Sequence, residues 1–359
     1  MKRVDSRESM SLTVKTTSWV VGGLLCAALA VFSPALAVEA DAPIRVFATL
    51  PDLGSLAKEV GGDEVSVVNM VEGTEDPHFA PARPSWIKEL SKADVYVQVG
   101  MELEIGYASV LLQNARNGNV LPGNSGYIDA STVITPIEVP TGPVDRSMGD
   151  VHSFGNPHYL LDPINGLKVA QLLRDRFGQL RPAKAKYFDE RFDDFRRRVG
   201  VHLVGEQLAS KYDAEKLARL YEFGKLTAFL EKTGEAGQLG GWLGQMAPVR
   251  GAKVVDDHRL WPYFGHRFGI EIIDDLEPKP GVPPTTGHLT QLVEVMRHQG
   301  VKAIIVSPYY DPRHARFLSE ATGVTVVPLS HQVGGRPGTG DYLSMMDYNV
   351  RTLAEALGG

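Results

Sequence analysis

Apolar and polar positions after residue 42 alternate in the way that is typical of strands followed by helices. The strand-like segments are short continuous apolar runs, and the segments between them carry apolar residues at helical spacing, as at Leu53, Leu56 and Val60. In the first half of the chain the runs fall at residues 44–50, 65–71, 95–99 and 127–128. Strands that alternate with helices predict a parallel sheet with both faces covered.

The same rhythm returns in the second half of the chain. Its apolar runs fall at residues 252–255, 270–273, 302–306 and 324–327, and the last helix is predicted at 342–357. Four strands in each half predict the α/β class, with two similar (βα)4-type lobes and parallel sheets.

A long helix is predicted between the two series. Pro182 is favourable at a helix start, and an apolar stripe from Tyr187 to Leu208 continues the helix to about residue 211. A helix of about 30 residues spans about 45 Å and can join two lobes rigidly. The expected domains are therefore an N-terminal lobe, a connecting helix and a C-terminal lobe that begins with a peripheral insertion, at residues 38–181, 182–211, 212–359 and 212–248.

The first 37 residues have the pattern of a secretory signal. Basic residues such as Arg3 and Lys15 precede an apolar run from Trp19 to Phe32, and Ala35-Leu36-Ala37 provides a small-x-small cleavage motif. We expect cleavage after Ala37 and a periplasmic protein. An uncleaved membrane anchor is the alternative, but glycines and a proline interrupt the run, which is short for a membrane span.

Composition narrows the chemistry. The 359 residues are 43% hydrophobic and carry a net charge of -6, which does not favour nucleic acid as a partner. The only cysteine is Cys26 in the apolar run, and Leu25 stands before it where a lipoprotein signal has a small residue. The exported chain would then lack cysteine, so that a metal site must use nitrogen and oxygen ligands.

Three histidines lie where open α/β sheets present ligands. His78, His158 and His258 each occupy a loop next to a strand end or a helix start, and only the fold can bring such distant residues together. The H-E-x-x-H motif of zinc proteases is absent from the sequence. His152 lies near the end of a loop at residues 131–157 that is rich in proline and glycine. We expect it to be a solvated loop histidine, with lining of the cleft or transfer of metal inward as the alternatives.

Five sequence blocks carry a resemblance to a known family. They are D-P-H-F-A-P-A-R-P-S at 76–85, A-D-V-Y-V-Q-V-G-M-E-L-E at 93–104, N-P-H-Y-L-L-D-P-I-N at 156–165, V-V-D-D-H-R-L-W-P-Y-F at 254–264 and G-D-Y-L-S-M-M-D-Y-N at 340–349. In this order they resemble the zinc and manganese group of solute-binding proteins of bacterial ABC transporters. The resemblance implies one metal ion in a cleft between two lobes, delivered to a membrane permease, and no catalysis.

The resemblance also implies a set of ligands. The first three fall on His78, His158 and His258, and a carboxylate at the start of the last helix falls near Asp341, with Asp347 or water as alternatives. Three imidazoles and one carboxylate form a good tetrahedral shell for Zn²⁺, whereas Mn²⁺ prefers more oxygen. Some manganese-binding relatives have a carboxylate as third ligand, so His258 favours zinc over manganese.

We therefore expect a monomeric receptor that captures Zn²⁺, or alternatively Mn²⁺. One rival interpretation is an exported zinc hydrolase, which needs an open coordination position and a general base, for which Glu75 or Asp257 could be nominated. A second rival is an adhesin-like protein whose metal is structural.

Overall fold

The computed structural model describes residues 42–80, 83–144, 149, 151–279 and 281–358. The predicted signal segment and Cys26 lie outside these residues. Among the described helices, none combines the length and the apolar character that crossing a membrane requires.

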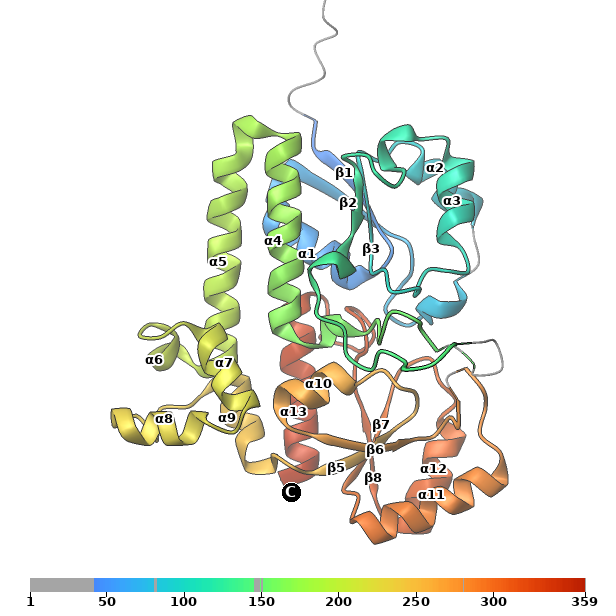
Figure 1. Ribbon diagram of the computed structural model, residues 1–359, viewed down its shortest axis with the longest axis vertical. Helices are drawn as coiled ribbons and strands as arrows, with labels where there is room; N and C mark the ends of the chain where they lie inside the picture. Colours follow the sequence, from blue (N-terminus) through green and yellow to red (C-terminus); the bar gives the residue numbers. More distant parts are fainter. Residues whose placement is uncertain (1–41, 81–82, 145–148, 150, 280, 359) are drawn as a thin grey trace, which may run out of the picture. The chain divides into compact units, whose positions relative to one another are not determined.

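Two four-stranded sheets organise the chain, and every strand pair in them is parallel (Figure 1). The first sheet has the order β2-β1-β3-β4, with β1 Ile44–Ala48, β2 Val65–Asn69, β3 Val95–Gln98 and β4 Tyr127–Asp129. The second has the order β6-β5-β7-β8, with β5 Lys253–Asp256, β6 Glu271–Asp275, β7 Ala303–Val306 and β8 Thr325–Pro328. The predicted class, α/β with two similar parallel sheets, is confirmed.

Burial explains which strands have continuous apolar sequences. The central strand β1 buries Val46, Phe47 and Ala48, because helices cover both faces of a parallel sheet. The edge strand β2 instead exposes Val68 and Asn69 near its carboxyl end. Loops that leave the carboxyl ends of the strands are the ones that carry the candidate site.

Helices pack around both sheets. Those of the first half are α1 Pro51–Gly61, α2 Pro84–Leu90 and α3 Ala108–Ala115. Those of the second half are α10 Pro262–Phe268, α11 Thr286–Gln299, α12 Pro312–Thr322 and α13 Tyr342–Gly358. Between them lie α4 Pro163–Leu180, α5 Ala185–Val204, α6 Glu206–Ala209, α7 Ala214–Glu222, α8 Leu226–Thr233 and α9 Gly241–Met246.

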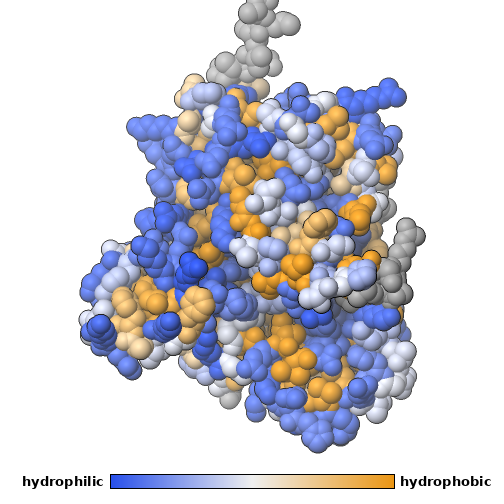
Figure 2. All heavy atoms as spheres, in the orientation of Figure 1, coloured by the Kyte–Doolittle hydropathy of each residue, from blue (hydrophilic) through white to orange (hydrophobic). Residues whose placement is uncertain are grey.

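The connecting helix is shorter than the sequence pattern predicts. After one 3₁₀ turn at Pro182–Lys184, α5 ends at Val204, and Gly205 breaks the helix with a φ of 84°. A Cβ at position 205 would lie 3.0 Å from the Cα of Gly240, so the close approach of two backbones requires glycine there. The antiparallel helices α4 and α5 form a hairpin (Figure 1), and hydrophilic residues cover the outer side of α5 (Figure 2).

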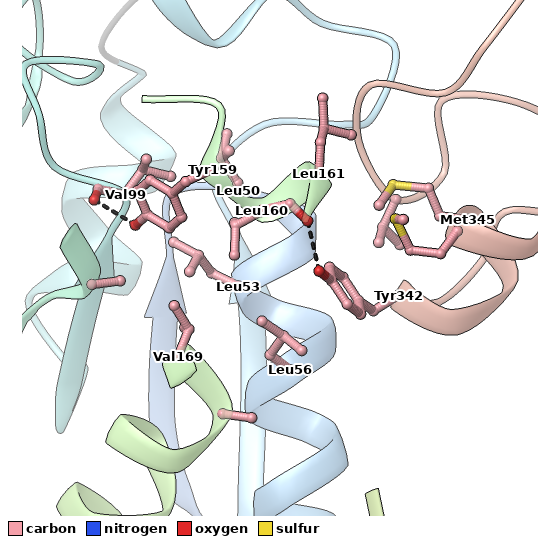
Figure 3. Packing of buried hydrophobic residues seen from close by; sticks show 14 of the residues in the cluster. Leu50, Leu53, Leu56, Val99, Tyr159, Leu160, Leu161, Val169, Tyr342 and Met345 are labelled. Atoms are coloured by element: carbon pink, nitrogen blue, oxygen red, sulfur yellow. Dashed lines mark hydrogen bonds between the residues drawn. The ribbon is translucent and has the colours of Figure 1, made fainter. Parts of the chain in front are cut away.

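One hydrophobic core extends through both halves of residues 42–359. Figure 3 shows the region where Tyr342 and Met345 of α13 meet Leu53 and Leu56 of α1. The hydroxyl of Tyr342 donates a hydrogen bond to the carbonyl oxygen of Leu160 at 2.6 Å. The last helix is thereby attached to the segment that precedes α4.

A buried ion pair adds a second connection between the halves. Arg267 of α10 donates to both carboxylate oxygens of Asp162, from Nε and Nη2 at 2.9 Å each. Asp162 also caps α4 by accepting from the amide of Ile164. The two side chains are only 7% and 8% exposed, so removal of either partner would leave the other charge buried.

We expect Arg267→Ala to lower the free energy of unfolding of the metal-free protein by about 3–5 kcal/mol, because the carboxylate of Asp162 would lose its buried counter-ion. Urea unfolding followed by circular dichroism measures this change. Lys186→Ala is the control, since Lys186 is 90% exposed, and a change within about 0.5 kcal/mol is expected there. A loss below about 1 kcal/mol for Arg267→Ala would contradict the importance of this pair.

Candidate metal centre

Three of the four predicted ligand residues come together in the structure. His78 lies in the 3₁₀ turn Pro77–Phe79 after β2, His158 precedes the 3₁₀ turn Tyr159–Leu161, and His258 follows β5. Each offers one ring nitrogen, and these nitrogens all lie within 4.8 Å of one another. His158 and His258 are buried, and His78 is half-buried. Within the described part of the chain, this is the group of histidine and acidic side chains suited to hold a metal ion.

The carboxylate of Asp76 orients the first histidine. One of its oxygens accepts from the backbone amide of His78 at 3.0 Å and lies 2.8 Å from Nδ1 of the same ring. Although burial raises it, the hydrogen bonds from His78 hold the pKa of Asp76 below its usual value, so this carboxylate is ionised. Nε2 of His78 is left buried and, among the described residues, without a hydrogen-bond partner. That nitrogen is the one available to a metal.

Glu277 plays the same part for the third histidine. Its Oε2 lies 2.6 Å from Nδ1 of His258 and also accepts from the amide of Gly281. Burial opposes the charged imidazole, but the hydrogen bond to Glu277 outweighs it and raises the pKa of His258 above its usual value. Sequence reasoning missed Glu277, since it lies 19 residues away in the loop after β6 and belongs to no recognisable motif.

A third partner orients His158, and it is another histidine. Nε2 of His331 lies 3.1 Å from Nδ1 of His158, while Nδ1 of His331 lies 2.7 Å from the hydroxyl of Tyr309. Burial lowers the pKa of both rings, that of His331 to about 3, so both are neutral. The sequence left open whether His331 is a surface residue or one that supports a ligand, and its contact with His158 agrees with the second interpretation. Its position just after β8, like that of His258 after β5, was the signal that could have found it.

The loop histidine His152 lies at the cluster rather than in solvent. Its ring stacks on that of His78 with centroids 5.5 Å apart, and it is 6.4 Å from the ring of His158. Burial lowers the pKa of His152 to about 3. Its Nε2 is buried and has no hydrogen-bond partner in the described segments. The expectation of a solvated side chain came from the proline and glycine content of the loop, which does not report tertiary contacts.

Neither acid predicted as the fourth ligand joins these histidines. Asp341 is exposed before α13, where its carboxylate accepts from the amide of Ser344 at 2.9 Å, and it borders a groove with α1 residues such as Ser55. Asp347 accepts from the indole of Trp242 at 2.6 Å and lies 3.0 Å from Nδ1 of His202. The structure thus uses Asp341 to cap the last helix, a role that aspartate favours at such positions.

A cavity of about 430 Å³ opens beside the cluster. Its lining includes His152, His158 and His258, together with Glu138 and Arg259. Arg259 pairs with Glu138 at 3.0 Å. The cavity gives access to three of the histidines, and apolar residues such as Val139 and Pro140 line it beside the Glu138–Arg259 pair.

The chain matches a known protein family. The model of the family described as zinc-uptake complex component A periplasmic matches residues 46–202 and 234–356. The chain belongs to this family. The resemblance inferred from the five sequence blocks is confirmed. The residues between the two matched parts hold α6, α7 and α8.

Individual relatives of the zinc-uptake component family agree with this placement. The metal ABC transporter substrate-binding lipoprotein SloC of Streptococcus mutans is 23% identical over 325 residues, which cover 89% of this chain and 91% of the relative. The manganese ABC transporter substrate-binding lipoprotein PsaA of Streptococcus anginosus is 22% identical over 320 residues, covering 88% and 89%. These relatives are named as substrate-binding proteins, in agreement with the expectation that the chain is not an enzyme.

A solved structure of a zinc-bound ZnuA deletion mutant shares the fold. Its TM-score is 0.64 at 20% identity, with 88% of this chain and 98% of that chain covered. The likeness supports the two-sheet architecture of the zinc-uptake component family.

Proposed function

We propose that this protein is the substrate-binding component of a metal ABC importer, which captures Zn²⁺ outside the cytoplasm and delivers it to a membrane permease. One observation carries the proposal: His78, His158 and His258 converge within 4.8 Å, each with Nδ1 engaged by another side chain. This arrangement leaves three Nε2 atoms to coordinate an ion. The relatives named as metal ABC transporter substrate-binding proteins support the same role.

Zinc is the proposed cargo because the three donors are imidazole nitrogens, which suit Zn²⁺ better than Mn²⁺. The relatives bind either metal by name, since PsaA is a manganese protein and the ZnuA mutant was solved with zinc. Manganese is therefore the alternative cargo.

A zinc hydrolase would need a general base, and neither candidate for that role, Asp257 or Glu75, has a free carboxylate. Asp257 accepts from the amide and the hydroxyl of Ser307, so both of its oxygens are engaged. Glu75 pairs with Arg83 and accepts from the amide of Glu72. Binding and release fit the site better than turnover does.

Release of the ion requires the halves of the chain to separate. His78 and His158 come from the first half, and His258 comes from the second, so a bound ion connects the two. The ion pair of Arg267 with Asp162 and the packing of Tyr342 restrict that separation to a small movement. We propose that docking on the permease drives the movement and that the receptor acts as a monomer.

The family is described as periplasmic, and the relatives SloC and PsaA are named as substrate-binding lipoproteins of ABC transporters. These names place the relatives outside the cytoplasm. We place this protein there as well. Cleavage after Ala37 gives a freely diffusing periplasmic receptor, whereas acylation of Cys26 would anchor it as in the relatives. Mass spectrometry of the exported protein distinguishes these two forms by the residue at its N-terminus.

We expect the purified protein to bind one Zn²⁺ per chain, and His78→Ala to weaken binding by more than about 100-fold, because loss of a direct ligand exceeds the effect of losing an outer partner. Calorimetry in competition with a chelator measures both values. His298→Ala, at an exposed position of α11, is the control and should bind as the unmodified protein does. Absence of stoichiometric zinc binding would refute the function, and unchanged affinity in His78→Ala would refute the ligand assignment.

We expect Glu277→Gln to weaken zinc binding by about 10–100-fold, because the amide cannot supply the negative charge that orients and polarises the ring of His258. The same competition calorimetry applies. Glu271→Gln removes a charge from an exposed position of β6 and should leave affinity unchanged. Equal affinities for the two variants would show that Glu277 has no part in the site.

A further inference from the structure

His152 is the histidine whose chemistry the proposed site does not yet use. Its Nε2 is buried, has no hydrogen-bond partner among the described residues, and belongs to a ring stacked on that of His78. A buried nitrogen without a partner costs about 1–3 kcal/mol of stability, so such atoms are uncommon unless they serve a ligand. Nε2 of His78, a proposed ligand, is the other histidine nitrogen in the described residues with this property.

The positions of the rings indicate that His152 can provide a fourth ligand to the same ion. The ring of His78 lies 5.2 Å from that of His158, 5.4 Å from that of His258 and 5.5 Å from that of His152. The ring of His158 is 6.4 Å from His152 and 6.3 Å from His258. The centroid distances from His152 to His78 and His158 are thus close to those from His258, although the ring of His152 lies nearly parallel to that of His78, at 29°, and its nitrogens fall outside the 4.8 Å group, so coordination would draw it inward. A tetrahedral zinc ion needs four such donors at about 2.0–2.1 Å.

Other candidates for the fourth ligand are already occupied. Both ring nitrogens of His331 have partners, one in Tyr309 and one in His158. The carboxylates of Asp76 and Glu277 face the Nδ1 atoms of His78 and His258. These groups orient the proposed ligands, whereas Nε2 of His152 is uncommitted.

The segment that carries His152 is held in place from both halves of the chain. The amide of Ser153 donates to Glu102 at 2.6 Å, within the first half. The side-chain amide of Asn156 donates to the carbonyl oxygen of Arg259 at 2.9 Å, next to His258. His152 also lines the 430 Å³ cavity through which the cluster is reached. Its segment therefore presents a donor at the boundary between the cavity and the other rings.

We propose that His152 is the fourth ligand of the captured ion, and that the resulting four-imidazole shell selects Zn²⁺ over Mn²⁺. The inference rests on the proposed function, whose cargo it specifies. Imidazole suits zinc, while manganese favours carboxylate, carbonyl and water oxygens, so that replacing the one expected carboxylate with a nitrogen shifts the preference towards zinc.

The test uses the exported chain with Zn²⁺ and with Mn²⁺ as separate probes. Long-range ¹H–¹⁵N NMR spectra of the histidine rings report which nitrogens bind metal. We expect four Nε2 signals to move on addition of zinc to the unmodified protein, and three in His152→Ala. In competition calorimetry the variant should lose at least about 10-fold in zinc affinity while its manganese affinity changes less, because a ligand contributes at least as much as an outer partner.

Controls separate coordination from damage to the loop. Phe154→Ala alters an exposed neighbour on the same segment and should retain four zinc-bound rings. His152→Gln keeps a polar side chain of similar length and should behave as His152→Ala does. Circular dichroism of each variant checks folding.

Two results would overturn the inference while leaving the receptor function intact: zinc binding to the unmodified protein without a shift of His152, or loss of a ligand signal in His331→Ala and not in His152→Ala. If the unmodified protein bound neither metal, the proposed function itself would fail, which is a different outcome.

Discussion

The candidate metal site depends on buried imidazole nitrogens that neighbouring side chains orient for coordination. A hydrogen-bond acceptor buried without a donor lowers the stability of a fold, and two Nε2 atoms of this cluster, in His78 and His152, are in that condition. Outer partners fix the rings in this arrangement: Asp76 holds His78, Glu277 holds His258, and His331 holds His158. Each partner engages Nδ1, so that the remaining nitrogen is directed to coordination before any ion arrives.

The architecture explains why such a site also controls the relation of the two halves. Loops at the carboxyl ends of strands in both sheets supply the rings, and an ion bound by all of them connects the sheets directly. The connections made by Arg267 and Tyr342 lie elsewhere in the same core, and they persist without metal. Capture therefore adds stability to a structure already assembled, in proportion to the logarithm of ion concentration over its dissociation constant.

Hydrophobic periodicity was sufficient to predict the two parallel sheets, because buried strands and amphipathic helices have distinct patterns. The break of the connecting helix at Gly205 was not predictable, since it depends on the approach of Gly240. The same holds for the site. His78, His158 and His258 were predicted to share a site from their positions at element ends and from the resemblance, and the structure brings them together. Asp341 lies apart from them, and the sequence could not show this because a capping aspartate and a ligating one look alike. The outer partner Glu277 and the loop residue His152 are identified only by tertiary contacts.

Charge balance is compatible with the proposed site, in which no carboxylate contacts the ion. A divalent ion among neutral imidazoles keeps its full charge, which a buried site must compensate. Asp76 and Glu277 supply two negative charges through the Nδ1 side of their histidines, and burial leaves both largely out of water, with side chains 19% and 12% exposed. The positive charge of a bound ion would thus be balanced by the two carboxylates that contact the ligands and not the ion itself. On the proposed assignment the atoms that contact the ion are all nitrogen, and the preference for zinc follows from those atoms rather than from the net charge of the site.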